Sequence, residues 1–336
     1  MEYRYLGSSG LKVSAIGLGT WITFAAQINS ETATECMRVA FDNGINFFDV
    51  AESHSGGQAQ IDMGVAFKRL QWRRSEFVVA TNIYWGGKGP NDRGLSRKHI
   101  IEGLSSSLKR LQLDYVDIVY GQRPDPDTPM EEIVRAFSWC IDKGMALYWG
   151  TSEWPPHLVI EAIKVAQQLN LVAPVVEQPQ YNMFHRERVE KEYLYLLENY
   201  KIGITGWSPL ASGVLTGKYN DGKIPSDARL SIQDHPVINR LRAGFFSVEG
   251  HRKMEKVKQL VVVADRLGIT PSQLAIAWCL KNTSVSSVIT GASRPSQVED
   301  NVKAIKCLHL LSNDVMQELE RILGNKPDPI FNFRSS

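Results

Sequence analysis

Short apolar runs alternate along the chain with longer stretches in which apolar residues recur every three or four positions. The short runs are typical of buried strands, and the longer stretches are typical of helices that pack on one face. We predict strands at residues 16–20, 45–48, 77–81, 116–120, 146–150, 175–178, 202–207 and 285–289. We predict helices at residues 57–69, 96–111, 128–143, 156–169, 186–199, 251–266, 271–281, 295–305 and 312–323, and one from Ser30 to a stop at Asn43-Gly44.

This regular alternation predicts an α/β fold in which parallel strands are joined by helices. Eight strand–helix units favour a closed (β/α)8 TIM barrel over an open doubly wound sheet. A β-hairpin over residues 3–14 is expected to cover the bottom of the barrel. The connection at residues 208–250, after the seventh strand, is much longer than an ordinary loop, so we expect a lid over a ligand. The whole chain, 1–336, is expected to be a single domain.

Polar side chains follow the apolar runs at the points where the strands end. Asp49 closes the run at 45–48, and His54 follows it after a short loop. Asn82 follows the next strand, and Gln122 follows the one after that. The carboxyl ends of the strands of such a barrel converge on one face, where these barrels keep their chemistry. We therefore predict that these four side chains form a catalytic site.

Composition argues against several classes of function. The net charge is +2 and no block of five or six like charges occurs, so we expect no nucleic-acid partner. No apolar run reaches the roughly 18 residues of a spanning helix, and no signal-peptide core is recognised near the start. The four cysteines are widely spaced, and no cluster has the form of a metal site. We expect buried reduced thiols, no metal, and a protein of the cytosol.

Two later segments carry the features of a phosphate site. The loop from Trp207 to Gly213 offers hydroxyl and backbone N–H groups, with Lys218 and Arg229 behind it. The segment from Gly291 to Arg294 opens a helix, and a helix amino end beside a cation binds anions. The loops after the seventh and eighth strands are where barrels often bind phosphate. The alternative is that both segments are surface turns with solvated cations.

Several segments resemble those of the aldo-keto reductases, and more narrowly the branch that contains voltage-gated potassium channel β subunits and their plant and microbial relatives. These segments are Gly19–Trp21, Asn43–Asp49, Gly94–Ile100, Tyr115–Val119, Arg123–Pro126, Tyr148–Ser152, Trp207–Leu210 and Leu274–Cys279. The resemblance implies a (β/α)8 barrel that holds NADPH across its carboxyl-end face. It also implies a small-molecule substrate, a homo-oligomer (a tetramer), and contact with a membrane only through a channel partner.

The resemblance further implies a set of cofactor contacts, carried over position by position. They are Thr20, Trp21, Gln27, Asp49, Ser152, Gln178, Trp207, Ser208, Pro209, Leu210, Ser212, Lys218, Arg229, Ser293, Gln297, Asp300 and Asn301. Lys218 and Arg229 would lie near the adenosine phosphates. The channel branch has arginine at the position that follows Ser152, and here that position is Glu153. This difference removes the basis for one polar contact.

The catalytic positions depart from the family pattern. The family reduces carbonyls with an Asp, a Tyr that acts as the acid, a Lys that lowers the pKa of the Tyr, and a His or Asn that orients the carbonyl. Asp49 matches the first position, and His54, Asn82 and Gln122 stand at the other three. His54 can take over proton transfer, because imidazole titrates near neutral pH. With the Asp49 carboxylate nearby, we expect the pKa of His54 above its usual value of about 6.5 unless burial opposes it.

Three classes of function remain open. The first is an NADPH-dependent reductase of a specialised carbonyl or activated C=C compound, with His54 in place of the usual Tyr. The second is a non-redox isomerase, dehydratase or cyclase that uses His54 and Asp49. The third is a catalytically weak channel β-type subunit that senses NADPH. Other histidines, His99 among them, are expected at exposed positions, and Glu52 is assigned no chemistry.

Overall fold

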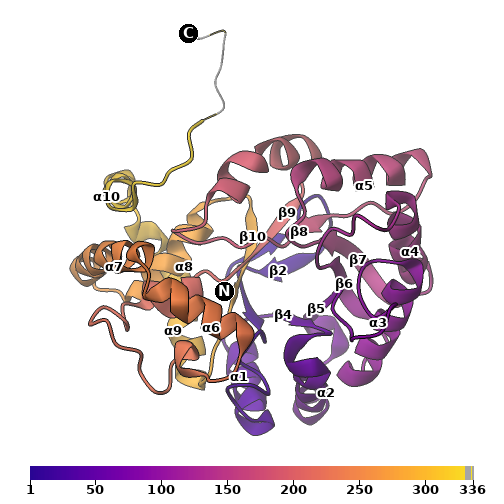
Figure 1. Cartoon of the computed structure of the whole chain (residues 1–336), viewed down its shortest axis with the longest axis horizontal. Coiled ribbons are helices and arrows are strands. Elements are labelled where there is room, and N and C mark those ends of the chain that lie inside the picture. Colours follow the sequence, from indigo (N-terminus) through magenta and orange to yellow (C-terminus); the bar gives the residue numbers. More distant parts are fainter. Residues whose placement is uncertain (330–333, 335–336) are drawn as a thin grey trace.

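Eight parallel strands close into a barrel in the computed structural model, which describes residues 1–329 and 334 (Figure 1). Around the ring their order is β10-β3-β4-β5-β6-β7-β8-β9. Their bounds are β3 Ile16–Gly19, β4 Phe47–Ala51, β5 Val78–Ile83, β6 Val116–Gly121, β7 Ala146–Thr151, β8 Val176–Glu177, β9 Gly203–Trp207 and β10 Val285–Thr290. The predicted (β/α)8 barrel is confirmed.

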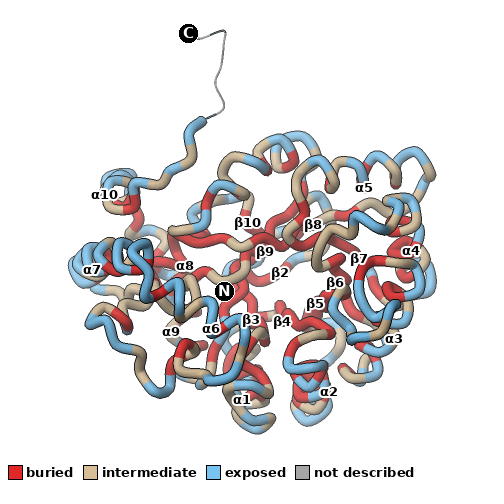
Figure 2. The backbone as a smooth tube through the Cα atoms, in the orientation of Figure 1, coloured by how far each residue is buried: buried red, intermediate tan, exposed pale blue. Residues whose placement is uncertain are grey.

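Helices surround this ring, and buried positions gather along the strands and the inward faces of the helices (Figure 2). Their bounds are α1 Ser30–Asp42, α2 Gln58–Leu70, α3 Arg97–Leu111, α4 Met130–Asp142, α5 Pro156–Gln168, α6 Pro236–Phe245, α7 Val248–Leu267, α8 Pro271–Lys281, α9 Pro295–Cys307 and α10 Asn313–Leu323. Side-chain caps begin several of them. The Thr270 hydroxyl accepts from the Gln273 N–H at 3.1 Å in a capping box that opens α8.

Two stretches differ from the sequence prediction. The helix predicted at 186–199 is wound partly as two wider π-helical segments, Arg188–Glu192 and Leu196–Tyr200. The connection at 208–250 contains helix α6, which was not predicted, as well as a 3₁₀ segment, Ala211–Thr216. Residues of this connection line the cavity described below. Its movement as a lid remains a prediction.

An antiparallel hairpin of β1 (Tyr3–Tyr5) and β2 (Lys12–Ser14) covers the amino end of the barrel, as expected. Leu6 and Val13 are fully buried in one cluster with side chains of β4, β5, β6, β8 and β10. Gly7 lies so close to the neighbouring backbone that a Cβ there would be 2.5 Å from the Gly203 nitrogen. The Arg4 guanidinium donates to the Val285 carbonyl at 2.7 Å. The hairpin therefore closes the amino end of the barrel, which leaves the carboxyl end of the strands open for a site.

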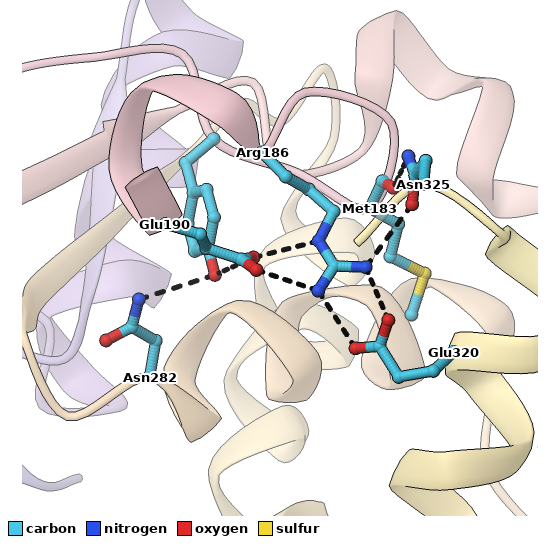
Figure 3. Close-up of polar contacts among 7 residues, drawn as sticks. Met183, Arg186, Glu190, Asn282, Glu320 and Asn325 are labelled. Atoms are coloured by element: carbon cyan, nitrogen blue, oxygen red, sulfur yellow. Dashed lines mark hydrogen bonds and ion pairs between the residues drawn. The ribbon is translucent and has the colours of Figure 1, made fainter. Parts of the chain in front are cut away.

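A buried ionic cluster holds α10 against the segment that follows β8 (Figure 3). The Arg186 guanidinium lies between the carboxylates of Glu190 and Glu320, with an N···O distance of 2.7 Å to each. Asn325 accepts from Arg186 at 3.3 Å and donates to the Met183 carbonyl at 2.8 Å. Because only 3% of the Arg186 side chain is exposed, these carboxylates take the place of water as partners of its charge and its N–H groups.

Within residues 1–329 and 334, no single helix is long and apolar enough to cross a membrane. The pair α7 and α8 meets the length and composition test only when the two are taken together across a 91° bend. In the same residues, no group of three or more His, Cys, Asp and Glu side chains could hold a metal ion. All four cysteines are buried free thiols, as expected.

Candidate active site

A cavity of about 760 Å³ opens where the carboxyl ends of the barrel strands meet. The predicted residues that line it are Trp21, Gln27, Asp49, His54, Asn82, Gln122, Ser152, Gln178, Trp207, Ser208, Pro209, Leu210, Ser212, Lys218, Arg229, Ser293, Gln297, Asp300 and Asn301. Thr20 is the one predicted residue outside this lining, because it is fully buried behind His54. The fold thus gathers the predicted set around one space, and the role of each residue stays a prediction.

Asp49 ends its buried strand with a carboxylate that is bound by amides. Its Oδ1 accepts from Gln178 Nε2 at 2.8 Å and from Asn82 Nδ2 at 3.4 Å. Burial raises the pKa of Asp49 to about 7, and the two amide hydrogen bonds oppose that rise. Asp49 is therefore the side chain of this group whose charge changes near neutral pH.

His54 begins a short 3₁₀ turn that ends at Gly57. Its Nδ1 accepts from the Ala51 backbone N–H at 3.2 Å and lies 2.8 Å from the Thr20 hydroxyl. A backbone N–H can only donate, so in the neutral ring Nδ1 is the acceptor and the proton resides on Nε2. The side chain lines the cavity, so this Nε2–H is the group that His54 can offer to a ligand.

The expected rise in the pKa of His54 is wrong. Burial lowers the pKa of His54 to about 3, and no carboxylate opposes that effect. Asp49 is bound by Gln178 and Asn82, and no hydrogen bond joins it to His54. His54 is therefore neutral near neutral pH, and its Nε2–H is free to donate a hydrogen bond.

Two amide oxygens beside this pair have no hydrogen-bond partner among the described residues. They are Asn82 Oδ1 and Gln122 Oε1, and both are buried. The Asn82 amide nitrogen is bound to Asp49 and to the Val50 carbonyl, at 3.4 and 3.2 Å. Because an unpaired buried acceptor is costly, these oxygens fit a ligand that donates hydrogen bonds.

Glu153 fixes the indole of Trp207. Its Oε1 accepts from Trp207 Nε1 at 2.9 Å and from the Gln180 backbone N–H at 2.5 Å. Trp21 meets the Trp207 ring edge to face, with 5.6 Å between ring centroids. The Glu153 carboxylate therefore orients one aromatic wall of the cavity.

The far part of the cavity holds three cations, Lys218, Arg229 and Arg294, which we call the cationic cluster. The Arg229 guanidinium lies over the Trp21 ring, 5.7 Å from its centroid. Burial lowers the pKa of Arg229, and burial followed by Arg229 itself lowers that of Lys218. Of the three, only Arg294 has an ion pair in the described chain, with exposed Asp227 at 3.1 Å. Crowded and desolvated cations of this kind favour an anionic ligand.

The other predicted contacts at this end have local partners already. Asp300 accepts from Thr270 Oγ1 at 3.0 Å and from Gln273 Nε2 at 2.6 Å, so its carboxylate is satisfied within the fold. Gln297 Oε1 accepts from the Ser293 N–H at 2.7 Å. Both donors are neutral, so Asp300 keeps its negative charge. The three cations of the cationic cluster still outnumber Asp227 and Asp300, the two carboxylates that line this end.

Comparison with known proteins identifies the family. The family model described as "Aldo/keto reductase family" matches residues 15–323. The chain belongs to the aldo/keto reductase family. It is 51% identical over 328 residues to a protein of Arabidopsis thaliana named "Probable voltage-gated potassium channel subunit beta", covering 97% of this chain and 98% of that one. A protein of Oryza sativa subsp. japonica with the same name is 49% identical over 335 residues, covering 99% and 100%.

In this member of the aldo/keto reductase family, one residue near the site differs from the sequence prediction. His99 is buried and not exposed as expected, because its Nε2 lies 3.0 Å from Glu52 Oε1 inside the fold. The same Glu52 oxygen accepts from the Tyr84 backbone N–H at 2.7 Å. Glu52 thus holds the backbone beside Trp85, which lines the cavity.

Sequence reasoning missed several residues of the cavity wall. They include Thr23, Ser53, Trp85, Arg123, Pro225, Asp227, Val237 and Ser272, whereas Gly291 and Arg294 belong to the segment predicted to bind phosphate. Trp85 and Arg123 had a usable signal, because each stands one to three residues beyond a predicted catalytic position at a strand end. Val237 had none, since it belongs to the helix that was not predicted.

Proposed function

We propose that this family member is an NADPH-dependent reductase with an altered reaction site, which acts on a specialised carbonyl or activated C=C compound. One observation carries the proposal: a single cavity joins the cationic cluster to the Asp49 and His54 side chains. Its volume of about 760 Å³ lies in the range of cofactor sites, and a dinucleotide with its phosphates at the cationic cluster would extend its reactive ring toward Asp49. This family's general use of NADP(H) supports the cofactor, and the substrate is proposed as a class only.

The residues fit the cofactor in charge and in shape. The cationic cluster would hold the phosphates, and Trp21, stacked under Arg229, would lie beside them. Ser152 and Gln178 are joined by a hydrogen bond of 2.9 Å from the Ser152 hydroxyl to the Gln178 carbonyl, and they would hold the nicotinamide end. When bound, NADPH supplies a hydride to the electrophilic carbon of the substrate.

His54 would stabilise the negative charge that develops on the substrate oxygen. Its Nε2–H is fixed because Nδ1 is held by Thr20 and the Ala51 N–H, so little reorganisation is needed during the reaction. A neutral imidazole in this role is known from other enzymes. The Gln122 amide, whose oxygen is unpaired, would bind a second polar group of the substrate.

Asp49 would hold or release a proton according to pH. Its pKa of about 7 makes it neutral in about half of the molecules at neutral pH. The protonated form would put no negative charge beside the forming alkoxide, and its proton would complete the alcohol, which leaves Asp49 as a carboxylate. The rate of reduction is therefore expected to fall as pH rises through about 7.

The test is a cofactor experiment. Purified protein is mixed with NADPH and a panel of aldehydes, ketones and enones, and nicotinamide absorbance is followed with and without each substrate. Oxidation that requires the substrate and is lost in Asp49→Leu supports the proposal. Tight NADPH binding with no oxidation by any member of the panel speaks against it.

A second candidate is a channel β-type subunit, and the names of the two plant relatives favour it. In that case the protein would form a homotetramer in the cytosol, bind NADPH, and contact a potassium channel without turning over a substrate. Light scattering gives the oligomeric state, and co-purification with a plant channel tests the contact. A monomer that binds no channel would count against this candidate.

A third candidate is a non-redox isomerase, dehydratase or cyclase, which the pKa of Asp49 near neutrality favours. Here Asp49 moves a proton and His54 supplies a hydrogen bond, and no hydride leaves the cofactor. Product formation with no change in nicotinamide absorbance would distinguish this candidate from the reductase.

A further inference from the structure

Arg123 places a positive charge in the reaction half of the cavity, and neither the proposed mechanism nor any family expectation uses it. It follows Gln122 directly, two residues beyond the end of β6, and its side chain is partly buried in the cavity wall. Its Nη1 donates to the Gln122 carbonyl at 2.5 Å, which ties the base of the guanidinium to the strand end. The other nitrogens have no recorded partner within the described residues.

Asp125, in the same connection after β6, makes no ion pair with Arg123, and its oxygens are occupied by neutral donors. Asp125 accepts from the Leu95 N–H at 2.6 Å, the Thr128 hydroxyl at 2.8 Å and the Asp127 N–H at 3.1 Å. No ion pair of Arg123 is found among the described side chains, whereas Arg294 at the far end has one. A guanidinium in a partly enclosed cavity without a carboxylate partner is available to a ligand.

The position of Arg123 separates it from the cationic cluster. In the ring, β6 lies four strands from β10 in either direction, so Arg123 stands across the barrel mouth from Arg294. A dinucleotide whose phosphates lie at the cationic cluster would therefore leave Arg123 to the substrate. Trp85, 42% exposed, lines the same half of the cavity and offers an apolar face.

We propose that Arg123 selects the substrate: it binds a carboxylate on a carbonyl compound whose planar or apolar body lies against Trp85. The proposal rests on the reductase function and adds the substrate class. A carboxylate matches the fork of one guanidinium in two parallel hydrogen bonds. Such charged hydrogen bonds favour the anionic compound over its neutral analogue by roughly ten- to a hundred-fold.

The experiment compares a matched pair of aldehydes, 4-carboxybenzaldehyde and methyl 4-formylbenzoate, by kcat/KM with NADPH. We expect the wild type to prefer the carboxylate by roughly ten-fold or more. Arg123→Gln should abolish this preference through KM, and Arg123→Lys should restore part of it. The matched control is Arg93→Gln, since exposed Arg93 lies 5.7 Å over the Trp85 ring but outside the cavity lining. It should keep the preference.

A binding measurement separates this proposal from the reductase function. Benzoate and benzamide are titrated into the protein–NADP⁺ complex by tryptophan fluorescence, which needs no turnover. Arg123-dependent preference for benzoate without any aldehyde reduction would support the anion site and overturn the reductase. Reduction of both aldehydes at equal kcat/KM, or equal preference in wild type and Arg123→Gln, would overturn the anion site alone.

Discussion

Replacing His54 by alanine tests the central feature of the reaction site, a neutral imidazole held in one tautomer. The substitution removes the Nε2–H from the cavity, and it also removes the Nδ1 that accepts from the Ala51 N–H. The Thr20 hydroxyl, 2.8 Å from Nδ1, loses the same partner. The change therefore has one consequence for catalysis and another for stability, and the two can be measured separately.

The catalytic cost follows from the loss of one fixed hydrogen-bond donor. Removing a single donor to a developing oxyanion costs about 10²–10³-fold in rate. Leaving two buried polar groups unpaired costs about 1–3 kcal/mol of folding free energy for each, unless water enters the space. The NADPH affinity should stay within a few-fold, because the cationic cluster lies at the other end of the cavity.

The assay is a single-turnover measurement at saturating NADPH and substrate, between about pH 5 and 9 and well below the melting temperature. The matched control is His185→Ala, because His185 is an exposed histidine outside the cavity lining. The wild-type rate should show no inflection from His54, whose pKa is about 3, and one from Asp49 near 7. Full activity of His54→Ala at saturating substrate would refute a catalytic His54.

Four further outcomes are expected. The cationic cluster predicts tighter binding of NADPH than of NADH by fluorescence titration, and equal affinities would contradict it. The wild type should reduce nitrobenzaldehyde very weakly, and the double replacement His54→Tyr with Asn82→Lys should raise the rate. Steady-state kinetics measures both rates. For Asp49, the folded pKa of about 7 exceeds the unfolded 3.8, so its contribution to stability is lost as pH rises through that window. The free energy of unfolding of Asp49→Asn, relative to that of the wild type, should therefore rise by up to about 4 kcal/mol between pH 4 and 8. Denaturant unfolding at each pH measures this difference. Glu320→Gln should cost about 2–3 kcal/mol of unfolding free energy, because it replaces one charged hydrogen-bond partner of the buried Arg186 guanidinium, which keeps Glu190. Its matched control on the same helix, Glu318→Gln, should cost much less, since its partner Arg266 is exposed.

The fold and the membership of the site were predictable because both depend on sequence order. A short apolar run followed by a polar residue marks a strand end, and parallel closure brings all such ends together. That reasoning places Asp49, Asn82 and Gln122 around one cavity. Helix α6 was missed because it is a short helix with mostly exposed residues, inside a connection that carries no strand pattern.

The electrostatic state of the site was not predictable from spacing. A carboxylate five residues before His54 suggests an ion pair, but the 3₁₀ turn directs Nδ1 to the Ala51 N–H and to Thr20. His99 was misread for a related reason. Its partner Glu52 is distant in sequence, and only the packed structure shows that both side chains are buried.

Burial makes His54 neutral and raises the pKa of Asp49. The family resemblance leads us to expect a lysine beside the aspartate, and the side chain that donates to Asp49 from β5 is the neutral amide of Asn82. An amide hydrogen bond stabilises a buried carboxylate less than a cation does, so burial prevails and the pKa of Asp49 reaches about 7. Burial, without any carboxylate partner, lowers the pKa of His54 to about 3. It follows that restoring the cation alone, by Asn82→Lys, should lower the pKa of Asp49 and move the rate–pH inflection to a lower pH. An inflection that stays near 7 in this variant would show that the aspartate does not set it.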